Sequence, residues 1–184
     1  MGKIVGTLFV AVLLILAAAA LFIYSGLYDI GADAPHTRLV SGAIEALRDR
    51  SIAAHAKGVT MPADLGSPKR IVAGAGLYNE MCTGCHLGPG IERSELSQGL
   101  YPQAPQLAEA SDLTPAQQFW IIKHGVKLTA MPAWGKTHDD ELIWDMVAFL
   151  QRLPKLSAKQ YQAVVASAPQ DHDEMMKGMA HSAH

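Results

Sequence analysis

The sequence Met81-Cys82-Thr83-Gly84-Cys85-His86 is the most specific signal in this chain of 184 residues. Its two thiols are separated by two residues, so on a helix they lie about one turn apart and can add to the two vinyl groups of one haem. His86 follows the second thiol directly, which places it beneath the haem iron as an axial ligand. This C-x-x-C-H pattern predicts a single covalently attached haem c held by Cys82, Cys85 and His86.

Three other functions of a cysteine pair explain these residues less well. A disulfide between Cys82 and Cys85 would leave His86 without a role. A zinc site would need a second pair of ligands, and the chain has only these two cysteines. A thioredoxin-like redox pair is expected after a strand in a βαβ unit, whereas the residues before Cys82 have the pattern of a helix. We therefore favour haem attachment.

The second axial ligand determines whether the iron carries electrons or binds small molecules. Met131 lies 45 residues after His86 in the loop Lys127-Leu128-Thr129-Ala130-Met131-Pro132-Ala133-Trp134-Gly135. Pro132 restricts this loop, because its φ is fixed and it has no N–H group. His/Met ligation is common among cytochromes c, so we predict Met131 as the ligand, with His124 at the end of the preceding helix as its rival. The methionines interpreted as core or linker residues are Met61, Met81 and Met146.

From about Ser67 to Leu156 the chain resembles the class I monohaem cytochromes c, in the group related to the haem domain of cbb-type oxidase subunits. The resemblance rests on Ala73-Gly74-Ala75-Gly76-Leu77-Tyr78, the haem motif, Ala104-Pro105-Gln106-Leu107, Met131-Pro132-Ala133-Trp134-Gly135, and a last helix with Trp144 and Phe149. It implies an all-α, class I cytochrome c fold and one-electron transfer without catalytic residues. Leu87 and Gln106 stand where the family often has Gly and Asn, which affects hydrogen bonding around the haem ligands.

The helix before the haem motif is predicted over about residues 69–83. Gly74 and Gly76 would let another helix approach it closely, although glycine costs helix stability. The resemblance implies that the approaching helix is the last one, with Phe149 at the contact.

Two further helices are predicted after the haem motif. One begins with the capping box Thr114-Pro115-Ala116-Gln117 and stops before Gly125. The other covers about residues 139–153 and stops before Pro154. The residues expected in the core or against the haem are Phe119, Trp120 and Ile121 in the first, and Leu142, Ile143, Met146, Val147 and Leu150 in the second.

Residues Ile4 to Tyr24 form a run of 21 residues without a charge. A helix of this length is about 30 Å long, which matches the hydrocarbon core of a bilayer. A cleavable signal peptide is the alternative, since Lys3 supplies a basic start and Ala17 to Ala20 a small-residue cleavage site. The apolar region of a signal peptide is usually shorter, about 7 to 15 residues. We predict one uncleaved transmembrane anchor, residues 1–27, that contacts membrane lipid through residues 4–24.

A connector, residues 28–65, is predicted between this anchor and a haem domain of residues 66–156. An amphipathic helix in the connector presents on one face Val40, Ile44, Leu47, Ser51 and Ala54. This face packs on a neighbouring subunit, lies along the membrane, or belongs to a simple tether. A polar tail, residues 157–184, follows the haem domain. Its potential copper ligands are His172, Met175, Met176, Met179, His181 and His184, although a disordered terminus is the simpler interpretation.

The net charge of the chain and the expected side of the membrane limit the classes of function that fit this sequence. The net charge of −2, from 15 basic and 17 acidic residues, lacks the basic excess of a nucleic-acid-binding protein. Because haem c is attached outside the cytoplasm, we expect a single-pass protein of the bacterial inner membrane with its haem domain in the periplasm. We expect an electron carrier between respiratory partners: a quinol-oxidising complex or periplasmic dehydrogenase as donor, and a terminal oxidase as acceptor. The alternatives are a permanently bound subunit of such a complex and an open-haem sensor or peroxidase-like enzyme.

Overall fold

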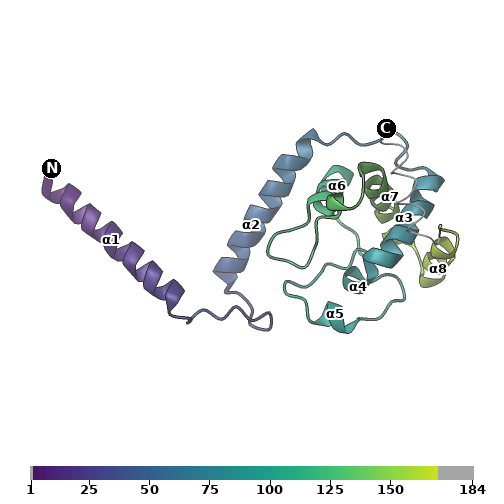
Figure 1. Cartoon of the computed structure of the whole chain (residues 1–184). Helices are drawn as coiled ribbons and strands as arrows, with labels where there is room; N and C mark the ends of the chain where they lie inside the picture. The colour runs from purple at the N-terminus through teal and green to yellow at the C-terminus, as the bar shows by residue number, and fades with distance from the viewer. Residues whose placement is uncertain (1, 170–184) are drawn as a thin grey trace. The chain divides into compact units, whose positions relative to one another are not determined.

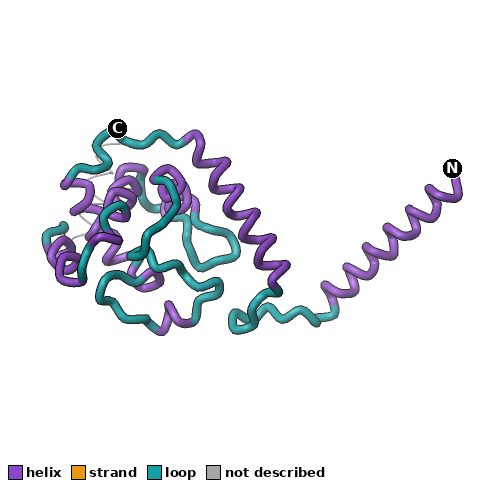
Figure 2. The backbone as a smooth tube through the Cα atoms, turned by 180° about the vertical axis from the view of Figure 1, so that it is seen from behind, coloured by secondary structure: helices purple, strands orange, loops and turns teal. Residues whose placement is uncertain are grey.

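The computed structural model describes residues 2–169, and its regular structure there is entirely helical (Figures 1 and 2). The chain divides between Pro35 and His36 into two compact units, which are described separately. The first unit contains α1 (Gly2–Tyr24). The second contains α2 (Arg38–His55), η1 (Ala56–Gly58), α3 (Pro68–Met81), α4 (Thr83–His86), α5 (Glu95–Gln98), α6 (Pro115–His124), η2 (Trp134–Lys136), α7 (Asp140–Leu150), η3 (Leu153–Lys155) and α8 (Ala158–Ala166). The predicted all-α fold is confirmed.

Helix α1 contains the whole apolar run that the sequence analysis identified. It has 23 residues and is long and apolar enough to cross a membrane. Beyond its end, the ring of Tyr28 lies edge-on to that of Phe22, with 6.4 Å between the ring centroids.

The centre of the second unit is the contact between α3 and α7. A Cβ atom at Gly74 would lie 1.9 Å from the carbonyl oxygen of Asp145 and 3.0 Å from the Cβ of Phe149. Only glycine allows the two helices to lie this close, as predicted from the sequence. Gly76 has a different role, because a Cβ there would meet Ala168 and Pro169 beyond α8 rather than the last helix.

Replacing Gly74 with alanine is expected to lower the free energy of unfolding by about 2 kcal/mol or more, because the two helices must move apart to admit the methyl group. Gly42→Ala is the matched control: Gly42 also lies inside a helix, and its Cβ would meet nothing within 4 Å. That control should be neutral or gain up to about 1 kcal/mol from helix propensity. Thermal unfolding followed by circular dichroism checks both, and equal stability of the two variants would contradict the close approach.

Helix α7 supplies most of the core. It begins after Asp139, whose carboxylate accepts a hydrogen bond from the N–H of Leu142 at 2.9 Å. It ends at Leu150, before the turn η3, which contains Pro154 and is not α-helical. The predicted apolar stripe is buried, and Trp144, Ala148 and Phe149 are buried with it. The capping box predicted at the start of α6, between Thr114 and Gln117, is present.

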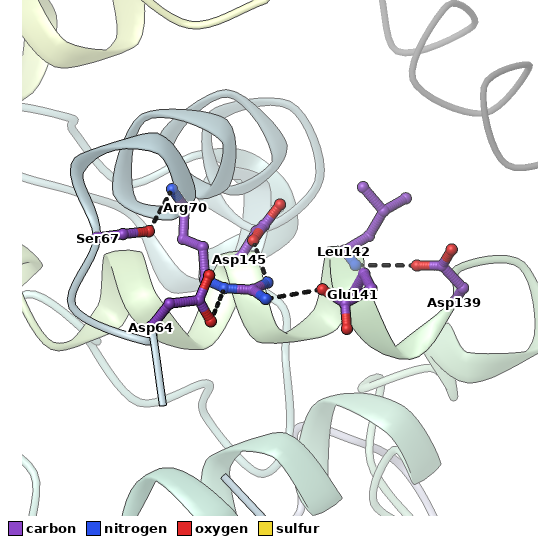
Figure 3. A network of polar contacts seen from close by, with 7 residues as sticks. All are labelled: Asp64, Ser67, Arg70, Asp139, Glu141, Leu142 and Asp145. Carbon is purple, nitrogen blue, oxygen red and sulfur yellow. Dashed lines mark hydrogen bonds and ion pairs between the residues drawn. The ribbon is translucent and has the colours of Figure 1, made fainter. Parts of the chain in front are cut away.

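A cluster of charges ties the start of α3 to the start of α7 (Figure 3). The guanidinium of Arg70 pairs with Asp64 at 2.9 Å, Glu141 at 2.7 Å and Asp145 at 2.8 Å. Burial alone would lower the pKa of Arg70, but its hydrogen bonds to the three carboxylates outweigh burial and raise the pKa above its ordinary value. Burial raises the pKa of Asp145, while Arg70 acts in the opposite direction.

The segment after the predicted haem domain begins with a structured element rather than with a tail. Helix α8 starts with a capping box formed by Ser157 and Gln160 and packs against α3. Tyr161 is buried there, and its hydroxyl donates to Asn79 Oδ1 at 2.9 Å. The segment is polar in overall composition, but Tyr161, Val164 and Val165 lie at helical spacing and pack on the core. These residues explain the difference from the predicted tail. The candidate copper ligands from His172 onward lie outside the described residues.

Candidate functional site: a haem cavity

The second unit contains a cavity of about 490 Å³, a size typical of small-molecule and cofactor sites. Helices α2, α3, α4, α6 and α7 and the loops beside them contribute to its wall. Cys82, Cys85, His86 and Met131 all line it. The structure thus brings the four predicted site residues together in one cavity, although Met131 lies far from the others in sequence.

The haem motif forms a single turn of helix. Cys82 ends α3 and precedes α4, and its carbonyl oxygen accepts hydrogen bonds from the N–H groups of Cys85 at 3.2 Å and His86 at 2.8 Å. Both thiols are free and half-buried. This turn places two thiols and an imidazole on one wall of the cavity, which is the arrangement that covalent haem attachment requires.

The environment of Cys82 does not favour a thioredoxin-like redox pair. Burial, assisted by the neighbouring Cys85, raises the pKa of the Cys82 thiol to about 12. Redox-active pairs depend on the opposite shift, because the thiolate is the nucleophile. The preceding element is also a helix, α3, where a thioredoxin-like unit would have a strand.

His86 is oriented by a hydrogen bond from its ring. Nδ1 lies 2.8 Å from the carbonyl oxygen of Pro105. A carbonyl oxygen only accepts, so Nδ1 bears the proton and Nε2 keeps the lone pair that binds a metal. Burial lowers the pKa of His86, partly offset by the hydrogen bond to Pro105, and the neutral ring is the form that binds iron. Pro105 belongs to the sequence Ala104 to Leu107 on which the family resemblance partly rests.

Leu87, the residue after the haem-motif histidine, has a backbone conformation that favours glycine. Its φ is +58°, in the left-handed region. The hydroxyl of Tyr78 donates to the Leu87 carbonyl oxygen at 2.8 Å, and both side chains are buried. Burial also raises the pKa of the Tyr78 hydroxyl, so it stays protonated and available as a donor. The positive φ explains why glycine suits this position. The hydrogen bond from Tyr78 and the burial of the side chain hold Leu87 in the same conformation.

The loop that carries Met131 is held by its own hydrogen bonds. The N–H of Met131 donates to Thr129 Oγ1 at 3.1 Å, and the Met131 carbonyl accepts from the N–H of Val126 at 3.3 Å. Gly125 ends α6 with a φ of +65°, and a Cβ there would lie 2.7 Å from both the Met131 oxygen and the carbonyl carbon of Pro132. The loop therefore folds back onto the end of α6 and places the thioether at the cavity.

The structure also separates the rival ligands. His124 does not line the cavity; its ring lies against Trp120, with 4.9 Å between the ring centroids. Met81 and Met146 do line it, the first beside Cys82 and the second in the core of α7. Of the three methionines that line the cavity, Met81 belongs to α3 and Met146 to α7, whereas Met131 belongs to a loop.

Sequence analysis missed one wall of the cavity, which α2 provides. Arg48, Asp49 and Ile52 line the cavity, and Ile52 is only 5% exposed. Of the predicted contact face, Val40, Ile44 and Ser51 are half-buried, whereas Leu47 is 72% exposed and Ala54 is exposed too. The packed face of α2 therefore overlaps the predicted one and extends beyond it to Arg48 and Ile52. In the sequence, the spacing i, i+4 of Arg48 and Ile52 was the feature that could have indicated this wall of the cavity.

In a comparison with protein families, residues 69–150 match the family described as cytochrome c oxidase, cbb3-type, subunit III. Comparisons with curated proteins and with solved structures gave no match. The matched segment runs from α3 to the end of α7 and includes Cys82, Cys85, His86 and Met131. The residues around the cavity fit a haem c: two adjacent thiols, an oriented imidazole, a loop methionine in the lining and largely apolar walls. Residues 69–150 form a cytochrome c domain of the cbb3-type oxidase subunit III family.

Proposed function

We propose that this protein is a membrane-tethered electron carrier with one haem c attached to Cys82 and Cys85 and with its iron between His86 and Met131. The observation that carries the proposal is that these four residues, from two separate segments, line one cavity of a cytochrome c domain. Helix α1, which has the length and composition of a membrane span, would be the tether. We infer a single-pass topology in the bacterial inner membrane, with the haem domain in the periplasm.

The bound haem supplies the Fe(III)/Fe(II) couple, which exchanges one electron at a time. The chain holds this group and adjusts its potential. The two thiols fix its position, and the Pro105 carbonyl fixes the ring of His86 so that Nε2 remains the ligand atom. The largely apolar walls would reduce the contact of the haem with water, and a thioether ligand raises the reduction potential. With His86 and Met131 as its ligands, the iron would be closed to small molecules.

The family description favours a terminal oxidase as the electron acceptor, since it names an oxidase subunit. A quinol-oxidising complex or a periplasmic dehydrogenase is the proposed donor. Tethering keeps the haem near its membrane partners and raises its effective concentration there.

The same description supports a second candidate function, a permanently bound subunit of an oxidase complex. A mobile carrier and a fixed subunit differ in one measurable property. After detergent extraction at moderate salt, a fixed subunit co-purifies with its complex in a constant ratio, and a mobile carrier is recovered alone.

A redox titration of the detergent-solubilised protein tests the carrier proposal. We expect one haem that titrates with a clearly positive midpoint potential, because His/Met ligation stabilises Fe(II). Carbon monoxide added to the reduced protein should leave its visible spectrum unchanged. A low midpoint together with ready carbon monoxide binding would refute the carrier and favour an open-haem sensor or peroxidase-like enzyme.

A further inference from the structure

Helix α2 lies outside the segment that matches the family, yet it packs on the cytochrome domain. The ring of His55 stacks on Trp120 of α6, with 5.3 Å between the centroids, and Ile52 and Ala56 are buried. At the other end, the N–H of His36 donates to the hydroxyl of Tyr101 at 2.7 Å. These contacts hold the helix against the domain at both ends.

The cavity wall that α2 supplies differs in charge from the rest of the lining. Among the described residues that line the cavity, Arg48 and Asp49 are the two with charged side chains. Arg48 is thus the permanent cation of an otherwise largely apolar cavity. Its side chain is 43% exposed, so the guanidinium lies at the edge of the cavity and not deep within it.

The hydrogen bonds of Arg48 leave most of its donors available. Its Nε lies 2.8 Å from Asp49 Oδ1. Within residues 2–169 the terminal groups Nη1 and Nη2 donate to no acceptor. A guanidinium held by Nε presents these two nitrogens as a planar pair, which matches the two oxygens of a carboxylate.

We propose that Arg48 binds a propionate group of the haem, so that α2 is part of the haem site. This inference rests on the proposed function, since it requires a haem in the cavity. The charged peripheral groups of a haem are its two propionates, which are carboxylates, and burying an unpaired carboxylate against an apolar wall is costly. The cavity has one permanent cation to pair with them, and it comes from α2.

Arg48 would then act on the haem in two ways. Its positive charge, close to the propionate, favours Fe(II) over Fe(III), because reduction removes one positive charge from the iron. The same contact would hold α2 against the haem. Loss of the cation should therefore lower the midpoint potential and make it depend on pH where the propionate titrates.

Three variants of the full-length, detergent-solubilised holoprotein test this assignment. Arg48→Gln removes the cation, Arg48→Lys keeps the charge without the fork, and Arg50→Gln is the matched control. Arg50 is an exposed arginine of the same helix that does not line the cavity. The measurements are haem content, the midpoint potential as a function of pH, and the carboxylate bands of the redox-difference infrared spectrum.

In Arg48→Gln we expect the ratio of reduced to oxidised haem at a fixed ambient potential to fall by roughly threefold to tenfold, the effect of one nearby unit charge at a protein surface. The propionate bands should shift in this variant. Arg48→Lys should recover part of the potential, and Arg50→Gln should match the unmodified protein in both readouts.

Two outcomes would overturn the assignment: equal potentials and infrared bands in Arg48→Gln and Arg50→Gln, or an equal loss of potential in both variants. The first would mean that Arg48 forms only a surface ion pair with Asp49, and the second that the effect is one of net charge. Failure of the proposed function has a different signature, because the unmodified protein would then lack covalent haem or bind carbon monoxide.

Discussion

The double variant Cys82→Ala/Cys85→Ala is expected to lose the haem and, with it, most of the folded protein. The domain surrounds a cavity of about 490 Å³. Without the haem, the apolar side chains that line this cavity would be exposed to water, at a cost of about 25 cal/mol for each Å² of apolar surface. The whole stability of a small domain is typically about 5–15 kcal/mol, so the haem-free chain should collapse or unfold. Alanine is chosen rather than serine, because serine would add two hydroxyl groups to the cavity wall. The loss of folded protein can then be attributed to the missing haem.

The control for this variant is Thr83→Ser, which changes a residue inside the motif but keeps both thiols and His86. It should accumulate with covalent haem at the level of the unmodified protein. Haem staining after denaturing electrophoresis, the amount of protein in membranes and the far-ultraviolet circular dichroism of purified samples give the comparison. A double variant that is well folded without haem would show that the core does not depend on the cofactor.

Met131→Ala is expected to retain covalent haem and to change its chemistry. Removing the thioether opens the iron, so the reduced protein should bind carbon monoxide. The midpoint potential should fall by on the order of 0.1 V or more, within the range of about 0.8 V over which axial ligands set haem potentials. Visible spectra with and without carbon monoxide and a redox titration measure both effects.

Met81→Leu and Met146→Leu are the matched controls, because both residues line the same cavity and leucine nearly conserves the volume of methionine. Each should keep a closed iron and a potential close to that of the unmodified protein. If Met131→Ala leaves the spectrum unchanged while one of the controls opens the iron, the ligand is that other methionine.

The local features of this protein could be predicted from the sequence, because each depends on neighbouring residues. The helical turn of the C-x-x-C-H motif, the capping box at Thr114 and the apolar run of α1 all appear in the structure as expected. In each case, a cap or the spacing along a helix determines the result within a few residues.

Contacts between distant segments were decided by the tertiary structure. The partner of His86 Nδ1, the carbonyl of Pro105, is a backbone atom that every residue has, so no side-chain pattern announces it. Gly76 faces the end of α8 rather than α7, because the tertiary arrangement assigns the two glycines to different neighbours.

Helix α2 shows the same division between local and tertiary determinants. Its sequence predicted an amphipathic helix, and the helix is present. The face that packs was predicted only in part, because the domain buries Ile52, has Arg48 at the cavity and leaves Leu47 in solvent. A long cationic side chain can cover apolar surface while its charged end stays accessible, so hydrophobic periodicity undercounts it. The sequence by itself therefore determined the haem-attachment motif and the helices, whereas the tertiary structure decided which residues surround the haem cavity.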